Sequence, residues 1–180
     1  MPDAGVGPRF SAGACGAWSV SIQSMSPASS RPIISGGRPI TGFKPVEMNG
    51  RKMLAAHIPE VKEGKWYFTQ LFVNDRRRPR TRLPKKDYYR VADLPGLPEG
   101  TAWSTGVKEF KFSPGEIDAS WRNLNDVDVI SLSLWIESRE QIESVDQAQQ
   151  MAYLNKPSRF WLWDDHSAKR GARYWIENVF

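Results

Sequence analysis

Between positions 66 and 78 the chain reads Trp66-Tyr67-Phe68-Thr69-Gln70-Leu71-Phe72-Val73, then Asn74-Asp75, then Arg76-Arg77-Arg78. Aromatic and β-branched side chains favour strands, and the first run is apolar on both faces except at Thr69 and Gln70, so it predicts a strand covered on both sides. Asn and Asp tolerate the left-handed backbone conformation, which suits a tight hairpin turn. The return segment 76–82 is charged and contains a proline, which cannot donate to a ladder. It therefore predicts an edge strand kept soluble by its charges.

The composition extends this pattern to the whole chain. Eight Trp, eight Phe and five Tyr among 180 residues suit pleated, half-buried surfaces, and thirteen Pro and fourteen Gly supply turns between short strands. The segment 127–136 has apolar residues at its even positions from 130, and serines at 131 and 133. This alternation predicts a strand with the serines opposite an apolar stripe. Shorter strands are predicted at 107–112, 160–163 and 174–176. The expected fold class is all-β.

The segment 138–155 is compatible with two structures. Ser138 and Gln141 have the spacing of a capping box, and the residues that follow include many good helix formers, which favours a helix. The alternative is a hairpin with strands at 139–145 and 150–154 and a turn near Asp146-Gln147. The local pattern alone does not decide between them.

Residues 1–31 are rich in Ala, Gly, Ser and Pro, and this composition predicts a disordered arm. The first residues lack the basic start and sustained apolar stretch of a secretion signal, and no apolar run approaches the ~20 residues of a membrane span. We therefore expect no membrane partner, and a cytoplasmic location for the chain as written. The single Cys15 cannot form an internal disulfide, which is compatible with a reducing compartment or with an unpaired surface thiol.

Several stretches, taken in order, share the pattern of one family. The first is Ile34-Ser35-Gly36-Gly37-Arg38-Pro39-Ile40-Thr41-Gly42-Phe43, and the second is 66–77 followed by 80–84. Trp121-Arg122-Asn123-Leu124, the strand up to Trp135, and Gly171-Ala172-Arg173-Tyr174-Trp175-Ile176-Glu177-Asn178-Val179 follow. Together they resemble the early part of right-handed parallel β-helix proteins related to glycoside hydrolase family 141. Asp75 stands where the family more commonly has Gly.

The resemblance implies an all-β accessory domain at 46–170, a β-sandwich or barrel-like domain inserted into a right-handed parallel β-helix. A rung fragment at 32–45 would precede this domain, and a return strand at 171–180 would follow it. The resemblance also favours the hairpin over the helix at 138–155. In the family the catalytic carboxylates lie on later rungs, which are missing here. The resemblance therefore implies that the chain is a non-catalytic, truncated piece of a secreted glycoside hydrolase.

The acidic residues do not form a convincing catalytic or metal site. Glycoside hydrolysis usually needs two carboxylates about 5 Å apart for retention, or about 6.5–9.5 Å apart for inversion. The visible pairs lie beside turn signals, where carboxylates usually accept backbone hydrogen bonds. They are Glu116 with Asp118, Asp126 with Asp128, and Asp164 with Asp165. Asp164-Asp165-His166 lacks a second cluster to complete a metal shell. We therefore predict no catalytic residue, no metal and no cofactor in this chain.

Two groups of residues are candidates for binding. Seven cations lie between 76 and 86, followed by Tyr88 and Tyr89, and the formal net charge is +5. Such a segment can hold a polyanion, although a protected edge strand has the same composition. The polyanion-contact candidates are Arg76, Arg78, Arg80 and Arg82.

Exposed tryptophans can stack on the apolar face of a pyranose, although most tryptophans are core residues. The carbohydrate-contact candidates are Trp161, Trp163 and Trp175. The favoured partner is an acidic polysaccharide, because it fits both the charges and the resemblance, and nucleic acid is disfavoured. The alternative function is a free-standing polyanion-binding module that uses segment 76–86.

Overall fold

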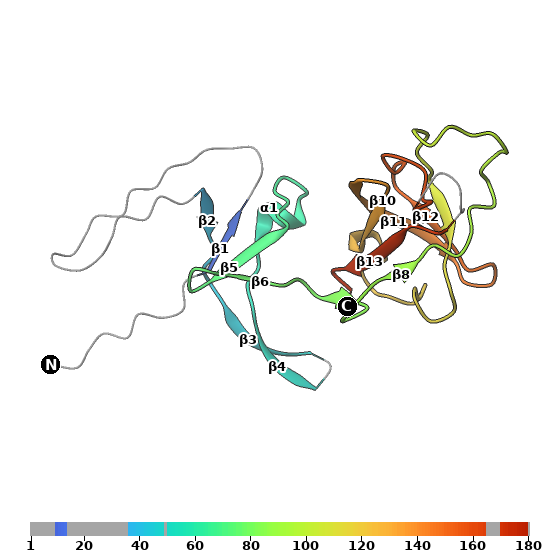
Figure 1. Ribbon diagram of the computed structural model, residues 1–180. Helices are drawn as coiled ribbons and strands as arrows, with labels where there is room; N and C mark the ends of the chain where they lie inside the picture. The colour runs from blue at the N-terminus through green and yellow to red at the C-terminus, as the bar shows by residue number, and fades with distance from the viewer. Residues whose placement is uncertain (1–9, 14–35, 49, 165–169, 180) are drawn as a thin grey trace, which may run out of the picture. The chain divides into compact units, whose positions relative to one another are not determined.

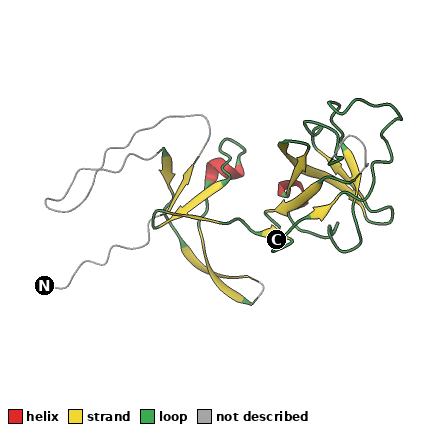
Figure 2. Ribbon diagram, viewed as in Figure 1, coloured by secondary structure: helices red, strands yellow, loops and turns green. Residues whose placement is uncertain are grey.

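The computed structural model describes residues 10–13, 36–48, 50–164 and 170–179, and it divides the chain into two compact units, 1–80 and 81–180 (Figure 1). Strands dominate both units, and the described helical segments are the short α1 (Pro59–Lys62) and η1 (Leu124–Asp126) (Figure 2). The all-β expectation is confirmed. Neither described helical segment has the length or apolar content to cross a membrane. The predicted disordered arm lies outside the described residues except for Phe10–Gly13, which form β1.

The first unit contains a four-stranded antiparallel sheet and a separate two-stranded ladder. The sheet has the order β2-β1-β5-β6, with β2 at Gly37–Pro39, β5 at Gln70–Val73 and β6 at Arg76–Arg78. The ladder pairs β3 (Lys44–Met48) with β4 (Arg51–Ala55). Every strand pairing described in the structure, in both units, is antiparallel. The parallel rung expected at 32–45 is therefore not among the described pairings.

The hairpin expected after Val73 is present. Asn74 and Asp75 have φ of 52° and 60°, and Val73 pairs directly with Arg76. β6 is at the edge of its sheet and its three arginines are exposed, as the edge-strand argument predicts. The strand before the turn is shorter than expected and only half-buried. Residues 66–69 lie outside the strand, and the backbone N–H of Trp66 donates to the carbonyl of Glu60, the second residue of α1.

The second unit is one continuous antiparallel sheet that folds over into two layers. The order is β7-β13-β10-β11-β12-β9, and β8 also pairs with β13. The bounds are β7 (Arg82–Leu83), β8 (Tyr89–Arg90), β9 (Glu109–Lys111), β10 (Asp128–Ser133), β11 (Ile136–Asp146), β12 (Met151–Leu154) and β13 (Arg173–Glu177).

β11 belongs to both layers. Its first half pairs with β10, its second half pairs with β12, and its register shifts between Ile142 and Ser144. A strand that changes partners at an irregularity makes the corner of a sandwich. The described strands do not close into a barrel.

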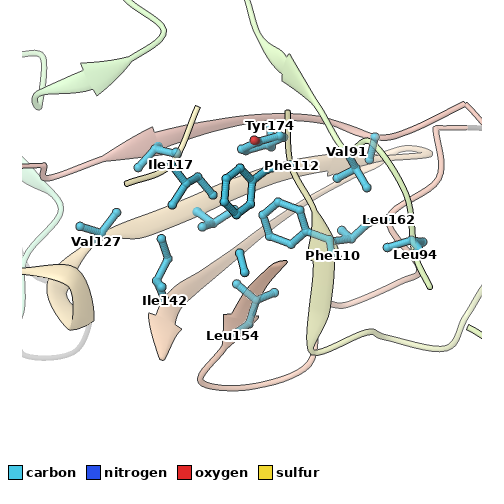
Figure 3. Packing of buried hydrophobic residues seen from close by; sticks show 14 residues of the cluster. Val91, Leu94, Phe110, Phe112, Ile117, Val127, Ile142, Leu154, Leu162 and Tyr174 are labelled. Atoms are coloured by element: carbon cyan, nitrogen blue, oxygen red, sulfur yellow. The ribbon is translucent and has the colours of Figure 1, made fainter. Parts of the chain in front are cut away.

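The core lies between these two layers (Figure 3). Phe110 and Phe112 come from β9 and the residue just after it, and both are fully buried. The ring of Phe110 meets that of Tyr174, on β13, edge to face, with 5.2 Å between the centroids. The hydroxyl of Tyr174 donates to Glu116 Oε2 at 2.6 Å, which satisfies a polar group that would be costly to bury alone. Burial raises the pKa of this hydroxyl, so it stays protonated and remains a donor.

The hairpin at 138–155 is confirmed and the helix is wrong. β11 and β12 are paired strands joined by a turn at 147–150. Burial along β11 alternates, with Ser138, Glu140 and Ile142 buried and the residues between them partly exposed. A helix would scatter these residues around its circumference, so the pairing with β10 and β12 overrides the local helix preference.

Two other predicted strands differ from the structure. The segment 127–136 is interrupted by a two-residue turn at Leu134–Trp135, where Leu134 has φ of 54°. Its serines at 131 and 133 face the interior and are 1% and 0% exposed. The segment 160–163 is not a strand, and only Trp163 makes an isolated bridge, to Gly171.

The expected return strand at 171–180 also takes a different place. β13 is an interior strand of the second unit's own sheet, where it pairs with β10, β7 and β8. The segment is therefore part of this unit's own sheet. Tyr174 and Ile176 lie in the core because the alternation of β13 turns them inward.

A row of polar side chains lies on the inner face of the β10–β11 hairpin. It consists of Ser131, Ser133, Ser138 and Glu140, all at least nine-tenths buried. Glu140 is 4% exposed, and within the described part of the chain its Oε2 has no hydrogen-bond partner. Burial raises the pKa of Glu140 to about 7, although the charges of Lys156 and Arg139 act in the opposite direction.

This buried carboxyl makes stability depend on pH. Below the usual pKa of 4.5 the group is protonated in both the folded and the unfolded chain. Between 4.5 and about 7 it ionises only in the unfolded chain, so the free energy of unfolding falls as pH rises. Glu140→Gln should therefore gain about 3 kcal/mol relative to the wild type between about pH 4 and about pH 8. Urea unfolding followed by tryptophan fluorescence measures this, and Glu143→Gln, at an exposed position of β11, is the control. A pH-independent difference would contradict the assignment.

Candidate functional site

The three tryptophans named as carbohydrate contacts have different environments. Trp163 packs against the core, and Leu162 beside it is 1% exposed. Trp161 is half-buried, and its backbone N–H donates to the carbonyl of Trp103 at 3.2 Å. Trp175 lies on β13 between two core residues, so its ring is on the outer face of the sheet.

The four arginines named as polyanion contacts are divided between the two units. Arg76 and Arg78 are exposed on β6, and Arg80 is the last residue of the first unit. Arg82 is on β7 in the second unit, where its backbone lies opposite that of Glu177 on β13. The basic segment 76–86 is therefore not one continuous strand, because the boundary between the units falls inside it.

One cluster brings members of both candidate groups together. The guanidinium of Arg82 lies 5.0 Å from the ring centroid of Trp175 and 5.2 Å from that of Tyr88. The two rings meet at 62° with centroids 5.7 Å apart. The guanidinium of Arg173 lies 5.7 Å from the Tyr88 ring. We call Arg82, Tyr88, Arg173 and Trp175 the Arg82 cluster.

Strand alternation and register place these side chains. Arg173 and Trp175 are two residues apart on β13 and share its outer face. Arg82 reaches the same face because it is the direct partner of Glu177. Tyr88 follows in the short loop after β7, which Arg82 closes by donating from Nη2 to the carbonyl of Asp87 at 2.6 Å. Tyr88 is 45% exposed, so the cluster is open to solvent on at least one side.

A network of hydrogen bonds connects the Trp175 ring to Glu177, Arg139 and Asp128. The indole Nε1 of Trp175 donates to Glu177 Oε1 at 2.9 Å, and Arg139 donates to Glu177 Oε2 at 3.0 Å. Arg139 also donates to Asp128 Oδ2 at 3.2 Å, and Asp128 is 1% exposed. The carboxylates of Asp128 and Glu177 therefore accept hydrogen bonds from Arg139 and, in the case of Glu177, also from the indole of Trp175.

Arg82 differs from the other arginines of the same sheet in its charge environment. Arg90 lies 3.1 Å from Asp164, and Arg173 lies 3.8 Å from the same carboxylate. Within the described part of the chain, no carboxylate forms an ion pair with Arg82. Its guanidinium lies beside two rings, and no carboxylate of the described residues neutralises it. A positioned guanidinium with aromatic neighbours suits a ring-shaped anion, because it offers both parallel hydrogen bonds and a stacking surface.

The acidic pairs considered for catalysis have structural partners. Glu116 accepts from Tyr174 and from the backbone N–H of Ser113, and Asp118 accepts from the backbone N–H of Ser120. Asp128 and Asp164 are ion-paired, whereas Asp165 and His166 lie outside the described residues. Among the residues that the structure describes, no group of three or more His, Cys, Asp and Glu side chains is placed to hold a metal.

The sequence analysis missed the two most exposed indoles of the second unit. Trp135 is 69% exposed and Trp103 is 37% exposed. Trp135 falls within the strand predicted at 127–136, and Trp103 falls in no predicted element. The alternation of 127–136 gave no signal for the exposure of Trp135, because the serines that share its side at 131 and 133 are themselves buried.

The hydrogen-bond network of Trp175, Glu177, Arg139 and Asp128 gives a prediction about stability. Arg139→Met should lower the free energy of unfolding by about 3 kcal/mol, because it leaves the buried carboxylate of Asp128 without its cationic partner. The double variant Asp128→Asn/Arg139→Met should recover part of this loss, since it removes the buried charge as well. Arg122→Met, at an exposed arginine, is the control and should change stability by less than about 0.5 kcal/mol. An Arg139 variant as stable as this control would contradict the network.

Comparisons with known proteins identify no relative of this chain. A scan against protein-family models, a search of curated proteins and a search of solved structures each return no match for the chain.

Proposed function

We propose that the chain is a non-catalytic carbohydrate-binding β-domain whose ligand is an acidic polysaccharide. The observation that carries the proposal is the Arg82 cluster, where an arginine without a carboxylate partner among the described residues is stacked on two aromatic rings. The resemblance to glycoside hydrolase family 141 supports the same class of ligand. On this proposal the domain is accessory to a larger carbohydrate-active protein, and positions substrate for carboxylates that lie elsewhere.

The chemistry of a uronic acid ring matches the cluster. One face of such a ring is lined by C–H groups and can lie on an aromatic side chain, such as the exposed ring of Tyr88. Its carboxylate can accept two parallel hydrogen bonds from a guanidinium. The guanidiniums of Arg82 and Arg173 lie 5.2 Å and 5.7 Å from the centroid of the Tyr88 ring, so a sugar bound at Tyr88 has two cations close by.

The alternative is a general polyanion-binding module, and the observation in its favour is β6. Three consecutive arginines on this edge strand are exposed. Charge alone would bind any polyanion, including single-stranded nucleic acid, and affinity would fall steeply with salt. Arg76→Gln/Arg77→Gln/Arg78→Gln removes this surface and leaves the Arg82 cluster intact.

The binding prediction concerns polygalacturonate, measured by affinity electrophoresis and calorimetry. The wild type should bind it, and Arg82→Gln should weaken binding at least about tenfold, the equivalent of about 1.4 kcal/mol. Tyr88→Ala should weaken it similarly, although this change removes no charge. Lys86→Gln, at an exposed cation close in sequence, is the matched control and should change affinity by less than about threefold.

Three outcomes would count against the proposal. Absence of polygalacturonate binding would remove its ligand. Equal losses in Arg82→Gln and Lys86→Gln would show that net charge is what matters. Tight binding of an oligothymidylate that is lost in the triple β6 variant would favour the polyanion module instead.

The proposed parent protein has a separate test at the level of the gene. The genomic sequence on both sides of this reading frame, translated in all frames, should encode β-helix rungs with candidate carboxylates downstream. Unrelated flanking sequence would remove the link to a family 141-like protein, but it would leave the binding proposal to stand on polygalacturonate alone.

A further inference from the structure

A second aromatic cluster lies in the 81–180 unit, at the tip of the β10–β11 hairpin. The ring centroids of Trp103 and Trp135 are 5.2 Å apart, with 60° between the ring planes. Phe160 meets both, at 4.9 Å from Trp103 and 5.5 Å from Trp135. Phe160 is 8% exposed, whereas Trp103 and Trp135 are 37% and 69% exposed. One buried ring therefore supports two exposed ones. We call Trp103, Trp135 and Phe160 the hairpin-tip cluster.

The backbone that carries these rings is fixed by hydrogen bonds. The Trp103 turn is closed by the N–H of Thr105, which donates to the carbonyl of Ala102 at 2.9 Å. The hydroxyl of Ser158 donates to the carbonyl of Phe160 at 2.6 Å and accepts from the N–H of Val107 at 3.0 Å. A Cβ at Gly106 would collide with the carbonyl of Ser158, so the Trp103 loop lies directly against the segment that bears Phe160. The backbone that carries Trp103 and Phe160 is thus fixed by contacts within the unit.

The turn that presents Trp135 is also energetically unfavourable. Leu134, the residue before it, has φ of 54°, a conformation that costs an L-residue other than Gly, Asn or Asp on the order of 1 kcal/mol. A two-residue hairpin turn normally carries Gly or Asn at such a position. Strained backbone next to an exposed indole is the arrangement expected where a side chain is displayed for contact, and not where it serves the core.

The size of the exposed surface indicates the kind of partner. At 69% and 37% exposure, and with ~250 Å² for a whole indole side chain, the two tryptophans offer roughly 260 Å². A stable protein interface needs about 800 Å² on each partner. The surface is instead of the size that one or two sugar rings cover. One cation adjoins the cluster: the guanidinium of Arg159 lies 5.5 Å from the centroid of the supporting Phe160 ring. The two exposed indoles themselves are an uncharged stacking surface.

We propose that the hairpin-tip cluster binds the apolar face of an uncharged pyranose in a neutral polysaccharide. Trp135 and Trp103 stack on the ring, and Arg159, at the edge of the cluster, donates hydrogen bonds to its hydroxyls. This site uses none of the residues of the Arg82 cluster and does not depend on the function proposed for it. The same unit then has one contact surface for a charged sugar and another for a neutral one.

The test is affinity electrophoresis in gels containing hydroxyethylcellulose, arabinoxylan or galactomannan, all neutral polymers. At least one of them should retard the wild type, and the retardation should be unchanged between about 50 and about 200 mM salt, because no phosphate-like or carboxylate charge is involved. Trp135→Ala should weaken binding at least about tenfold, and Trp103→Ala should weaken it in the same direction. Arg82→Gln should retain it. Trp135 is largely exposed, so its replacement should leave the thermal unfolding midpoint nearly unchanged, which verifies that the variant is folded.

Each other outcome overturns the inference. No retardation by any of the three polymers excludes a neutral-sugar site, and so does equal retardation of the wild type and Trp135→Ala. If sedimentation instead shows concentration-dependent self-association that Trp135→Ala abolishes, the cluster contacts a second copy of the chain. Failure of polygalacturonate binding, by contrast, bears only on the Arg82 cluster, which Arg82→Gln identifies separately.

Discussion

Backbone hydrogen bonding along β11 holds the 81–180 unit together. This strand gives one half of its length to β10 and the other half to β12, so it joins the group β7, β8, β13 and β10 to the group β12 and β9. If residues 138–155 formed a helix, their N–H and C=O groups would be satisfied locally, and β10 and β9 would each lose a partner strand. The irregularity between Ile142 and Ser144 then allows the sheet to turn over and enclose Phe110, Phe112 and Tyr174.

The outer face of the sheet follows from the same ladder. Once β10 is fixed against β11, β13 pairs with the other side of β10, and its alternation turns Tyr174 inward and Trp175 outward. The register of β7 against β13 then brings Arg82 beside the Trp175 ring. Strand order and register therefore place Arg82, Arg173 and Trp175 together, and the loop after β7 adds Tyr88. Within the described residues the guanidinium of Arg82 has no carboxylate as an ion-pair partner, because Arg139 already pairs with Glu177 and Asp128.

Sequence patterns over a few residues predicted the structural features that depend on those residues alone. The turn at Asn74-Asp75 is set by the conformational tolerance of two residues, and it is where the sequence placed it. The segment 160–163 has the composition of a strand, but its backbone bonds are made elsewhere: the N–H of Trp161 donates to the carbonyl of Trp103. Likewise, Gly171 has no room for a Cβ because the carbonyl of Val91 lies against it, a contact between positions 80 residues apart. The split of the arginine segment between two units also depends on such distant pairings, which no window of sequence contains.

The exposed aromatic residues show where stability and folding do not account for the sequence. A polar residue in place of Trp135 would lose little burial, since the indole is already 69% exposed, and Gly or Asn in place of Leu134 would relieve a left-handed backbone. Tyr88 is in a similar position, because nearly half of its surface remains in solvent while two guanidiniums flank its ring. The core, by contrast, is satisfied: Phe110 and Phe112 are buried, and the Tyr174 hydroxyl has an acceptor. Natural sequences depart from locally favourable choices mainly at functional sites. The ligand contacts proposed for the Arg82 cluster and the hairpin-tip cluster would account for these exposed rings, which the fold itself does not require.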